Sequence, residues 1–317
     1  MKMKNKKEEL LSQKVLKNIS SLFLLLKEQN EPDLNLDRFK LLGKEIKDRE
    51  EFEKEVDEFF SILTRLIQDR KIYKEELKVA EKIQEALIPD EAPEIEGFDI
   101  FPYFKAARVV SGDYYDFIPI ASNLIGFTVA DVSGKGLPGS LIMSMARSVL
   151  RFESQQNPFP GLVLRHVSSV LLKDLKPGFF ITMVYAILNT TSKVLSVSSA
   201  GHNPVLLFRK SEGEIQELKP RGVGIGIGDE LFFEKHLFEE KFFLQQGDIY
   251  FMYTDGLTEA MNESEEEFGL ERVKEIILEN SDKSSKKIVE EIIKEVESFR
   301  KDAPQNDDIT ILCLKTK

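Results

Sequence analysis

The residues of this sequence whose types and spacing could support chemistry are four aspartates at predicted turns. They are Asp113, Asp131, Asp255 and Asp307. Three of the four end or begin apolar stretches that are typical of buried strands. Carboxylate oxygens in such places, with few histidines or cysteines nearby, favour hard divalent cations over zinc. Two such ions would support metal-assisted hydrolysis, with a phosphate ester as the expected substrate.

The cost of gathering like charges makes the four acids more informative together than singly. Aspartate and glycine favour turns in any protein, so one motif such as Asp131-Val132-Ser133-Gly134 is weak evidence taken alone. Several carboxylates at adjoining strand ends are electrostatically unfavourable unless a cation neutralises them. The glycines after Asp131 would also let the backbone turn sharply and bring a main-chain carbonyl close to an ion.

The composition excludes several classes of protein. The chain has 317 residues, of which 42% are hydrophobic, enough for one large domain and a smaller one. Its net charge of −11 argues against a nucleic-acid partner, because such proteins usually carry a basic face. The single cysteine cannot form an intramolecular disulfide, which fits a reducing compartment. No apolar stretch is long enough to span a bilayer, so we expect a cytoplasmic protein without a membrane partner.

The first 89 residues are predicted to be helical and to precede the main domain. We expect a helical regulatory region over 1–45 and a long linker helix over 46–89, because only Gly43 and no proline interrupt residues 34–87. Apolar residues of the linker alternate at spacings of three and four, and Arg70 and Gln84 are polar members of the same seam. This pattern is typical of a dimeric coiled coil, in which polar seam residues fix the register. An amphipathic helix packed on its own domain would give the same pattern.

Residues 90–317 contain the predicted strands. Runs of strands are interrupted by pairs of helices and do not alternate with single helices, which predicts an α+β fold of two mostly antiparallel sheets with helices outside. The predicted strands are 98–106, 115–120, 124–132, 180–189, 194–200, 205–209, 214–218, 235–241, 249–253 and 309–314. The predicted helices are 139–152, 161–175, 269–280 and 284–300.

Six short motifs in this region, together with the lead-in Ala80–Pro89, resemble the SpoIIE/RsbU-type phosphatases in order and spacing. The motifs are Val110-Ser111-Gly112-Asp113-Tyr114-Tyr115-Asp116, Ala130-Asp131-Val132-Ser133-Gly134-Lys135-Gly136, Ser199-Ala200-Gly201-His202-Asn203-Pro204, Gly247-Asp248, Tyr253-Thr254-Asp255-Gly256 and Asn306-Asp307-Asp308-Ile309-Thr310. These enzymes are the bacterial branch of the metal-dependent PPM (type 2C) serine/threonine phosphatases. The resemblance covers residues 80–317, and six motifs in order are far more specific than any one of them.

The resemblance implies a PPM-type β-sandwich flanked by helices, with two Mn²⁺ or Mg²⁺ ions. By it, Asp131 bridges both ions and the Val132 carbonyl completes one coordination shell. Asp255 and Asp307 hold one ion and Asp113 holds the other. A water bridging the ions then attacks phosphoserine or phosphothreonine, and no covalent nucleophile is needed, in agreement with the chemistry of two-metal sites.

The sequence departs from the eukaryotic members of this class at two places. Ser133 occupies the position of a histidine proposed there to protonate the leaving group, and no arginine clearly matches their phosphate-binding arginine, although Arg108 is nearby. His202 could be catalytic or could orient backbone groups. Lys135, between two glycines, could meet a phosphate or be a solvated turn residue. Gly139 stands where alanine is frequent in the bacterial branch.

These observations favour a metal-dependent protein phosphatase controlled by its N-terminal helices. The resemblance implies a phosphorylated regulatory protein as substrate, such as a STAS-type anti-sigma-factor antagonist. We also expect a homodimer and an activating partner at the N-terminal helices. The alternative is a catalytically silent module that binds the phosphoprotein, and a third hypothesis is a structural role centred on the coiled coil.

Overall fold

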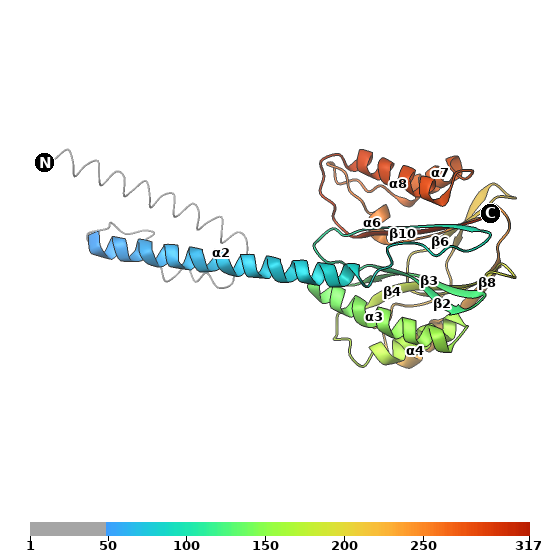
Figure 1. The fold of residues 1–317 in the computed structure, drawn as a ribbon, viewed down its shortest axis with the longest axis horizontal. Helices are drawn as coiled ribbons and strands as arrows, with labels where there is room; N and C mark the ends of the chain where they lie inside the picture. Colours follow the sequence, from blue (N-terminus) through green and yellow to red (C-terminus); the bar gives the residue numbers. More distant parts are fainter. Residues whose placement is uncertain (1–48) are drawn as a thin grey trace. The chain divides into compact units, whose positions relative to one another are not determined.

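The computed structural model describes residues 49–317, and the chain divides into two units, 1–74 and 75–317 (Figure 1). The predicted helical region 1–45 lies outside the described residues. Of the first unit, the structure describes one part of helix α2, which runs from Arg49–Glu85 and continues into the second unit. A helix thus occupies most of the predicted linker 46–89, and its role as a linker and its pairing into a coiled coil stay predictions. The second unit, called the catalytic unit below, begins at Glu75 and so includes the last turns of α2.

Two five-stranded antiparallel sheets form the centre of the catalytic unit, as predicted. The strands of the first sheet, in spatial order, are β1 (Phe98–Lys105), β10 (Ile309–Thr316), β9 (Ile249–Tyr253), β6 (Val205–Arg209) and β7 (Glu214–Leu218). Those of the second are β2 (Tyr114–Ala121), β3 (Leu124–Val132), β4 (Ile181–Asn189), β5 (Val194–Ala200) and β8 (Glu239–Phe243). Each sheet contains a strand pair that is distant in sequence, β1 with β10 in the first sheet and β5 with β8 in the second. Neither sheet could therefore form from local contacts alone.

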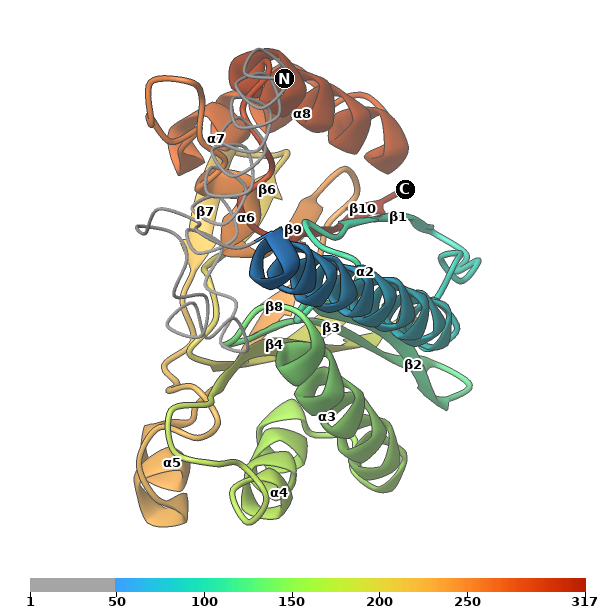
Figure 2. The same ribbon diagram turned by 90° about the vertical axis from the view of Figure 1, so that its left-hand side faces the viewer.

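Helices cover the outer face of each sheet, which makes four layers (Figures 1 and 2). Helices α3 (Leu137–Gln156) and α4 (Pro160–Leu171) pack on the second sheet, and α7 (Leu270–Glu279) and α8 (Ser285–Arg300) pack on the first. Each of the three interfaces between layers has its own buried apolar cluster. Central strands are thus buried on both faces, which explains why β9 is a continuous apolar run in the sequence.

One element differs from the sequence prediction. Residues 235–241 were predicted as a strand, but the chain forms helix α5 (Glu230–His236) followed by β8. The Asp229 side chain caps this helix by accepting a hydrogen bond of 2.8 Å from the Phe232 amide. Burial of Phe233 then anchors the helix among the residues that pack around α4. The N-cap decides the conformation here, because the apolar residues that follow it suit either a helix or a strand.

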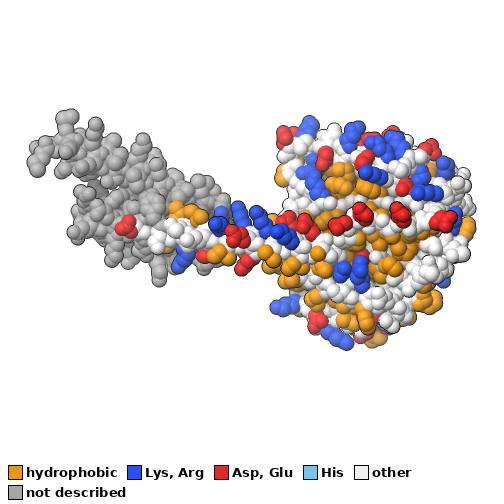
Figure 3. Space-filling model, viewed as in Figure 1, with side chains coloured by type: hydrophobic (Ala, Val, Ile, Leu, Met, Phe, Trp, Pro, Cys, Tyr) orange, Lys and Arg blue, Asp and Glu red, His pale blue; other side chains and the backbone are white. Residues whose placement is uncertain are grey.

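The surface agrees with the charge of the sequence. On the face of the catalytic unit shown in Figure 3, acidic and basic side chains are interspersed and form no continuous basic patch. None of the helices within residues 49–317 contains an apolar segment that could cross a membrane.

Candidate metal centre

Asp113 and Asp131 lie next to each other at one end of the second sheet. Asp113 directly precedes β2, and Asp131 is the second-last residue of β3. These strands pair antiparallel with Tyr114 opposite Ala130, so continuing the ladder by one residue brings the two aspartates opposite each other. The sequence prediction that these acids occupy strand ends is correct.

Asp255 and Asp307 come from the first sheet and are brought to the same place. Asp255 begins the one-turn helix α6 (Asp255–Thr258) two residues after β9, and Asp307 lies two residues before β10. Two hydroxyls join the sheets at this point, because Thr254 Oγ1 and Thr310 Oγ1 both donate to Asp113 Oδ2, at 2.7 and 2.6 Å. The two sheet ends therefore form one acidic site from four segments of the chain.

Asp308, the neighbour of a predicted ligand, has a structural task that the sequence did not reveal. Its Oδ2 accepts hydrogen bonds from Ser111 Oγ at 2.6 Å and from the Gly112 amide at 3.1 Å. Its Oδ1 accepts from the Ala107 amide at 2.7 Å. Asp308 thus holds the loop that carries Asp113, across a separation of almost 200 residues in sequence. Adjacent aspartates gave no signal that would separate this role from metal binding.

The electrostatics of the site disfavour the ionised form of three of its acids. Burial, together with the charges of Asp255, Asp307 and Asp308, raises the pKa of Asp131 to about 7. Burial and the charge of Asp131 raise the pKa of Asp113 well above its usual range, although hydrogen bonds from two threonines act in the opposite direction. The pKa of Asp255 is raised by burial and then by Asp307. Such a cluster is suited to a cation, which would return these groups to their ionised form.

Glu259 adds a further acid that the sequence analysis did not single out. Partial burial raises its pKa, and the charge of Asp255 is the next largest cause. It follows the α6 helix directly, so its distance from Asp255 along the chain is one helical turn. A Glu one turn after an Asp at a strand end is the signal that could have identified it.

Two features of the Asp131 loop bear on its predicted roles. Gly112 lies so close to Val132 that a Cβ on it would be 2.8 Å from the Val132 carbonyl oxygen, which explains the need for glycine there. Lys135 Nζ forms an ion pair of 2.8 Å with Asp307 Oδ2 and donates to the Asn306 carbonyl at 2.8 Å. Lys135 is therefore a half-exposed cation that faces one acid of the site, and its contact with a phosphate stays a prediction.

His202 bridges the two sheets beside the acids. Its Nδ1 lies 2.9 Å from Thr182 Oγ1 of β4, and its Nε2 lies 3.1 Å from the Tyr253 carbonyl at the end of β9. Since a carbonyl can only accept, Nε2 donates and Nδ1 accepts from the threonine. Burial lowers the pKa of His202 to about 4. A neutral ring with both nitrogens engaged orients the backbone before Asp255, which is the orienting role and not the catalytic one.

Ser133 and Gly139 are two positions that the sequence analysis noted as departures from the pattern of related phosphatases. The Ser133 amide donates to the Phe180 carbonyl at 2.9 Å, and the Phe180 amide donates to Ser133 Oγ at 2.7 Å, so this side chain supports the loop. A Cβ at Gly139 would lie 2.1 Å from the Gly134 carbonyl oxygen. The effect of Gly139 is thus on the position of the metal-site loop as well as on packing.

Arg108 lies near the site, which the sequence could not establish. Its side chain is exposed, and its Nη1 is 3.9 Å from the point where a Cβ on Gly136 would be. The guanidinium therefore faces the loop that begins at Asp131. A planar cation in this place is suited to bind the oxygens of a phosphate group.

The described residues contain no three acidic, histidine or cysteine side chains already gathered at metal-ligand spacing. The assignment of ligands consequently rests on strand positions and on the charges above. The donors themselves are carboxylates and main-chain carbonyls, which suit Mg²⁺ and Mn²⁺ and not zinc. The residues present thus fit a pair of hard divalent cations in their chemistry.

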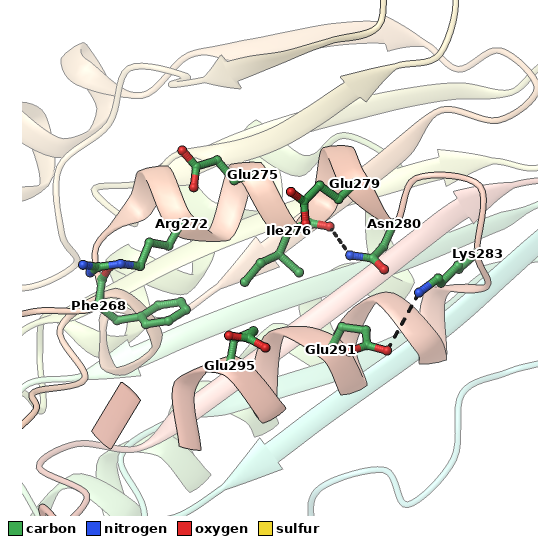
Figure 4. Close-up of a pocket in the computed structure, with 9 residues that line it drawn as sticks. All are labelled: Phe268, Arg272, Glu275, Ile276, Glu279, Asn280, Lys283, Glu291 and Glu295. Atoms are coloured by element: carbon green, nitrogen blue, oxygen red, sulfur yellow. Dashed lines mark hydrogen bonds and ion pairs between the residues drawn. The ribbon is translucent and has the colours of Figure 1, made fainter. Parts of the chain in front are cut away.

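A second acidic groove lies elsewhere, between α7 and α8 (Figure 4). Its volume is about 490 Å³, and Lys283 pairs across it with Glu291 at 3.8 Å. It is lined by Phe268, Arg272, Glu275, Ile276, Glu279, Asn280, Lys283, Glu291 and Glu295. None of the aspartates discussed above lines this groove, so it is separate from the candidate metal centre.

Comparisons with known proteins agree with this architecture. Residues 122–317 match the model of the family described as Stage II sporulation protein E (SpoIIE). The chain is 29% identical over 246 residues to phosphoserine phosphatase RsbU of Bacillus subtilis (strain 168), covering 77% of this chain and 71% of RsbU.

Solved structures share the fold at lower sequence identity. The SiaA-PP2C domain of Pseudomonas aeruginosa superposes with a TM-score of 0.69 at 23% identity, covering 78% of this chain and 99% of that domain. The catalytic domain of serine threonine protein phosphatase PstP in complex with two manganese ions has a TM-score of 0.50 at 12% identity, covering 69% and 97% of the two chains.

Two stacked antiparallel sheets with outer helices, and an acidic site at their common end, give the chain the PP2C fold. The match over more than half of the chain identifies the branch: the chain belongs to the SpoIIE family, as a SpoIIE/RsbU-type phosphatase.

Proposed function

We propose that this protein hydrolyses phosphoserine or phosphothreonine in a phosphorylated regulatory protein, with two Mn²⁺ or Mg²⁺ ions at the acidic site. It is a protein serine/threonine phosphatase of the PPM family. The observation that carries the proposal is the meeting of Asp113, Asp131, Asp255 and Asp307 at one end of two sheets, with the pKa of Asp131 raised to about 7. A cluster of this charge is costly unless cations bind there.

The residues of the chain divide the work as follows. Asp131 and the Val132 carbonyl would help to hold both ions, while Asp255 and Asp307 would hold one ion and Asp113 would hold the other. When bound, the two cations activate a water for attack and neutralise charge on the phosphoryl oxygens. The manganese complex of PstP, which shares the fold, supports this choice of metal.

Arg108 and Lys135 are two basic residues beside the acidic site. The Arg108 guanidinium faces the Gly136 backbone, where it would orient the phosphate of the substrate. Lys135 offsets the charge of Asp307. No residue of the described part emerges as general acid, because His202 is held as a neutral ring and Ser133 supports the loop.

The substrate and the partners are inferred from relatives. The name of RsbU, phosphoserine phosphatase, supports a phosphoserine substrate. We infer a STAS-type regulatory protein as that substrate, a homodimer formed through the linker helix, and an activating partner at the N-terminal helices. The cytoplasmic location stays a prediction.

Hydrolysis of p-nitrophenyl phosphate and of phosphorylated STAS proteins from the same genome, each titrated with Mn²⁺, tests the proposal. We expect turnover of both that disappears with EDTA and returns with Mn²⁺. Binding of a phosphoprotein without any release of phosphate would overturn it in favour of the silent binding module.

A further inference from the structure

The end of helix α2 is bonded directly to the loop that carries Asp113. Gln84, in the last turn of α2, is 7% exposed, and its side-chain amide makes two hydrogen bonds to the main chain of Ser111. Gln84 Nε2 donates to the Ser111 carbonyl at 2.7 Å, and the Ser111 amide donates to Gln84 Oε1 at 2.9 Å. A side-chain amide paired with both polar groups of one residue fixes the orientation of its peptide planes as well as its position.

Ser111 in turn holds the predicted metal ligand. Its Oγ accepts a hydrogen bond of 2.9 Å from the Asp113 amide and donates to Asp308 Oδ2 at 2.6 Å. The opposite side of Asp113 is held by Thr254 and Thr310 of the other sheet. The backbone of the Asp113 loop is therefore fixed by Asp308 on one side and by Gln84 on the other.

We propose that Gln84 is a positioning residue for Asp113, and hence for the cation that Asp113 serves. The inference rests on the proposed function for the role of Asp113. Without the glutamine amide, the Ser111 N–H and C=O would remain buried without partners, which is unfavourable, so the loop would move to hydrate them. Such a movement displaces Asp113 relative to Asp131 and weakens the site for one ion.

The surroundings of Gln84 allow its role to be tested by substitution. Gln84 also borders a cavity of about 520 Å³, whose lining includes Ile88, Pro89, Arg108 and Tyr115. A leucine at position 84 therefore has space without forcing the helix away from the unit. Loss of the two hydrogen bonds can then be studied apart from overpacking.

The test uses the full chain with Gln84→Leu, with Gln84→Glu, and with Gln68→Leu as a matched control at an exposed position of the same helix. Calorimetric titration with Mn²⁺ alone should show two ions bound to the wild type and to Gln68→Leu. In Gln84→Leu one ion should bind at least about tenfold more weakly, the usual scale for loss of a supporting hydrogen bond at a metal site. Gln84→Glu keeps an acceptor for the Ser111 amide but places a carboxylate oxygen against the Ser111 carbonyl, so it should also weaken binding of this ion.

A merely structural role would give a different pattern. If Gln84 only stabilised the fold, Gln84→Leu would lower the melting temperature while the Mn²⁺ titration matched the wild type, and the proposal would be overturned. Amide exchange of metal-free protein gives a second readout, with faster exchange expected in residues 107–113 of both Gln84 variants and nowhere else in the catalytic unit. Unchanged exchange there would also overturn the proposal. A wild type that binds no Mn²⁺ would instead refute the proposed function, and the exchange measurement would still decide the role of Gln84.

Discussion

Asp131 is the residue at which the charges of the site converge. Its pKa of about 7 has burial as the first cause and three neighbouring carboxylates as the next. The three acids come from the opposite sheet, so their effect on Asp131 exists only in the folded chain. Neutralising one carboxylate should consequently relieve repulsion in the metal-free protein while removing a ligand from the metal-bound one.

We expect Asp131→Asn or Asp255→Asn to reduce hydrolysis of p-nitrophenyl phosphate to less than about a tenth of wild type at saturating Mn²⁺, because a bridging or terminal charge is lost. The melting temperature of the metal-free variants should equal or exceed that of wild type. Asp302→Asn, at an exposed position in the turn after α8, is the control and should keep full activity. Activity above a tenth in either variant would contradict the two-metal assignment.

The lowered pKa of His202 should make the stability of the protein depend on pH. Its pKa is about 4 in the folded protein against an ordinary 6.5, so the unfolded chain takes up a proton first as the pH falls. Stability is therefore highest above pH 6.5 and decreases as the pH falls from 6.5 to about 4, with a total change of roughly 3 kcal/mol.

Urea unfolding in EDTA at pH 7.5 and pH 5 measures this effect. The aspartates with raised pKa values act in the opposite sense, so the useful quantity is the difference between wild type and His202→Asn. That difference should shrink at pH 5, because asparagine can make hydrogen bonds without titrating. An equal difference at both pH values would show that the ring is not held neutral.

At the scale of elements, the junction between the metal-site loop and α3 depends on a close backbone approach. A Cβ on Gly139 would lie only 2.1 Å from the Gly134 carbonyl oxygen. Alanine would otherwise be favoured at this helical position by up to about 1 kcal/mol. Helix propensity alone predicts that Gly139→Ala raises the free energy of unfolding. Because of the steric conflict with the loop, we expect this substitution to lower it.

Gly139→Ala should lower the free energy of unfolding by about 1–3 kcal/mol, the usual range for overpacking, and should change the Mn²⁺ dependence of activity. Ser148→Ala, exposed on the same helix, is the control and should be neutral or slightly stabilising. A stabilised Gly139→Ala protein with unchanged Mn²⁺ dependence would mean that the loop can move without cost.

The end of α2 corrects one interpretation of the linker. The sequence pattern placed Gln84 on the seam of a predicted coiled coil, where a polar residue would fix the register. The structure shows that this assignment is wrong, because the Gln84 side chain is buried in the catalytic unit and bonded to Ser111. The pattern of spacings three and four is the same for a partner helix and for the protein's own domain, so periodicity alone could not decide between them.

The melting temperature of the catalytic unit and its affinity for Mn²⁺ should depend on the residue at which a fragment begins. The unit includes the chain from Glu75, and both Gln84 and Ile88 are buried in it. A fragment 75–317 should therefore melt at a higher temperature and bind Mn²⁺ more tightly than a fragment 90–317. Equal melting temperatures of the two fragments would show that the last turns of α2 add nothing to the unit.

Assembly is the second whole-molecule prediction. If the linker helix pairs in parallel, Leu63→Asp combined with Leu77→Asp should convert a dimer to a monomer, because two charges would enter the apolar seam. Light scattering at tens of micromolar measures this, with Gln68→Leu as the control on the same helix. A wild type that is already monomeric would refute the coiled coil and leave α2 as a helix that serves its own chain.

The sequence by itself determined most of the elements and the chemistry of the site. The central strands are continuous apolar runs because they are buried on both faces. Aspartates at the ends of such runs indicated Asp113, Asp131, Asp255 and Asp307 as candidate site residues. The order of the motifs indicated the family, which the comparisons confirm. Each strand and each motif can be recognised in a short window of the chain, and the order of the motifs can be read along the sequence without the fold.

Only the tertiary structure decided which side chains hydrogen-bond or pack against one another. The support of the Asp113 loop by Asp308 and Gln84, the bridge made by His202, and the approach of Gly139 to Gly134 all depend on pairs brought together by folding. The same holds for Arg108, whose place beside Gly136 no spacing revealed. Hydrogen bonds and charges act over a few ångströms in space, whereas a sequence records distance only along the chain.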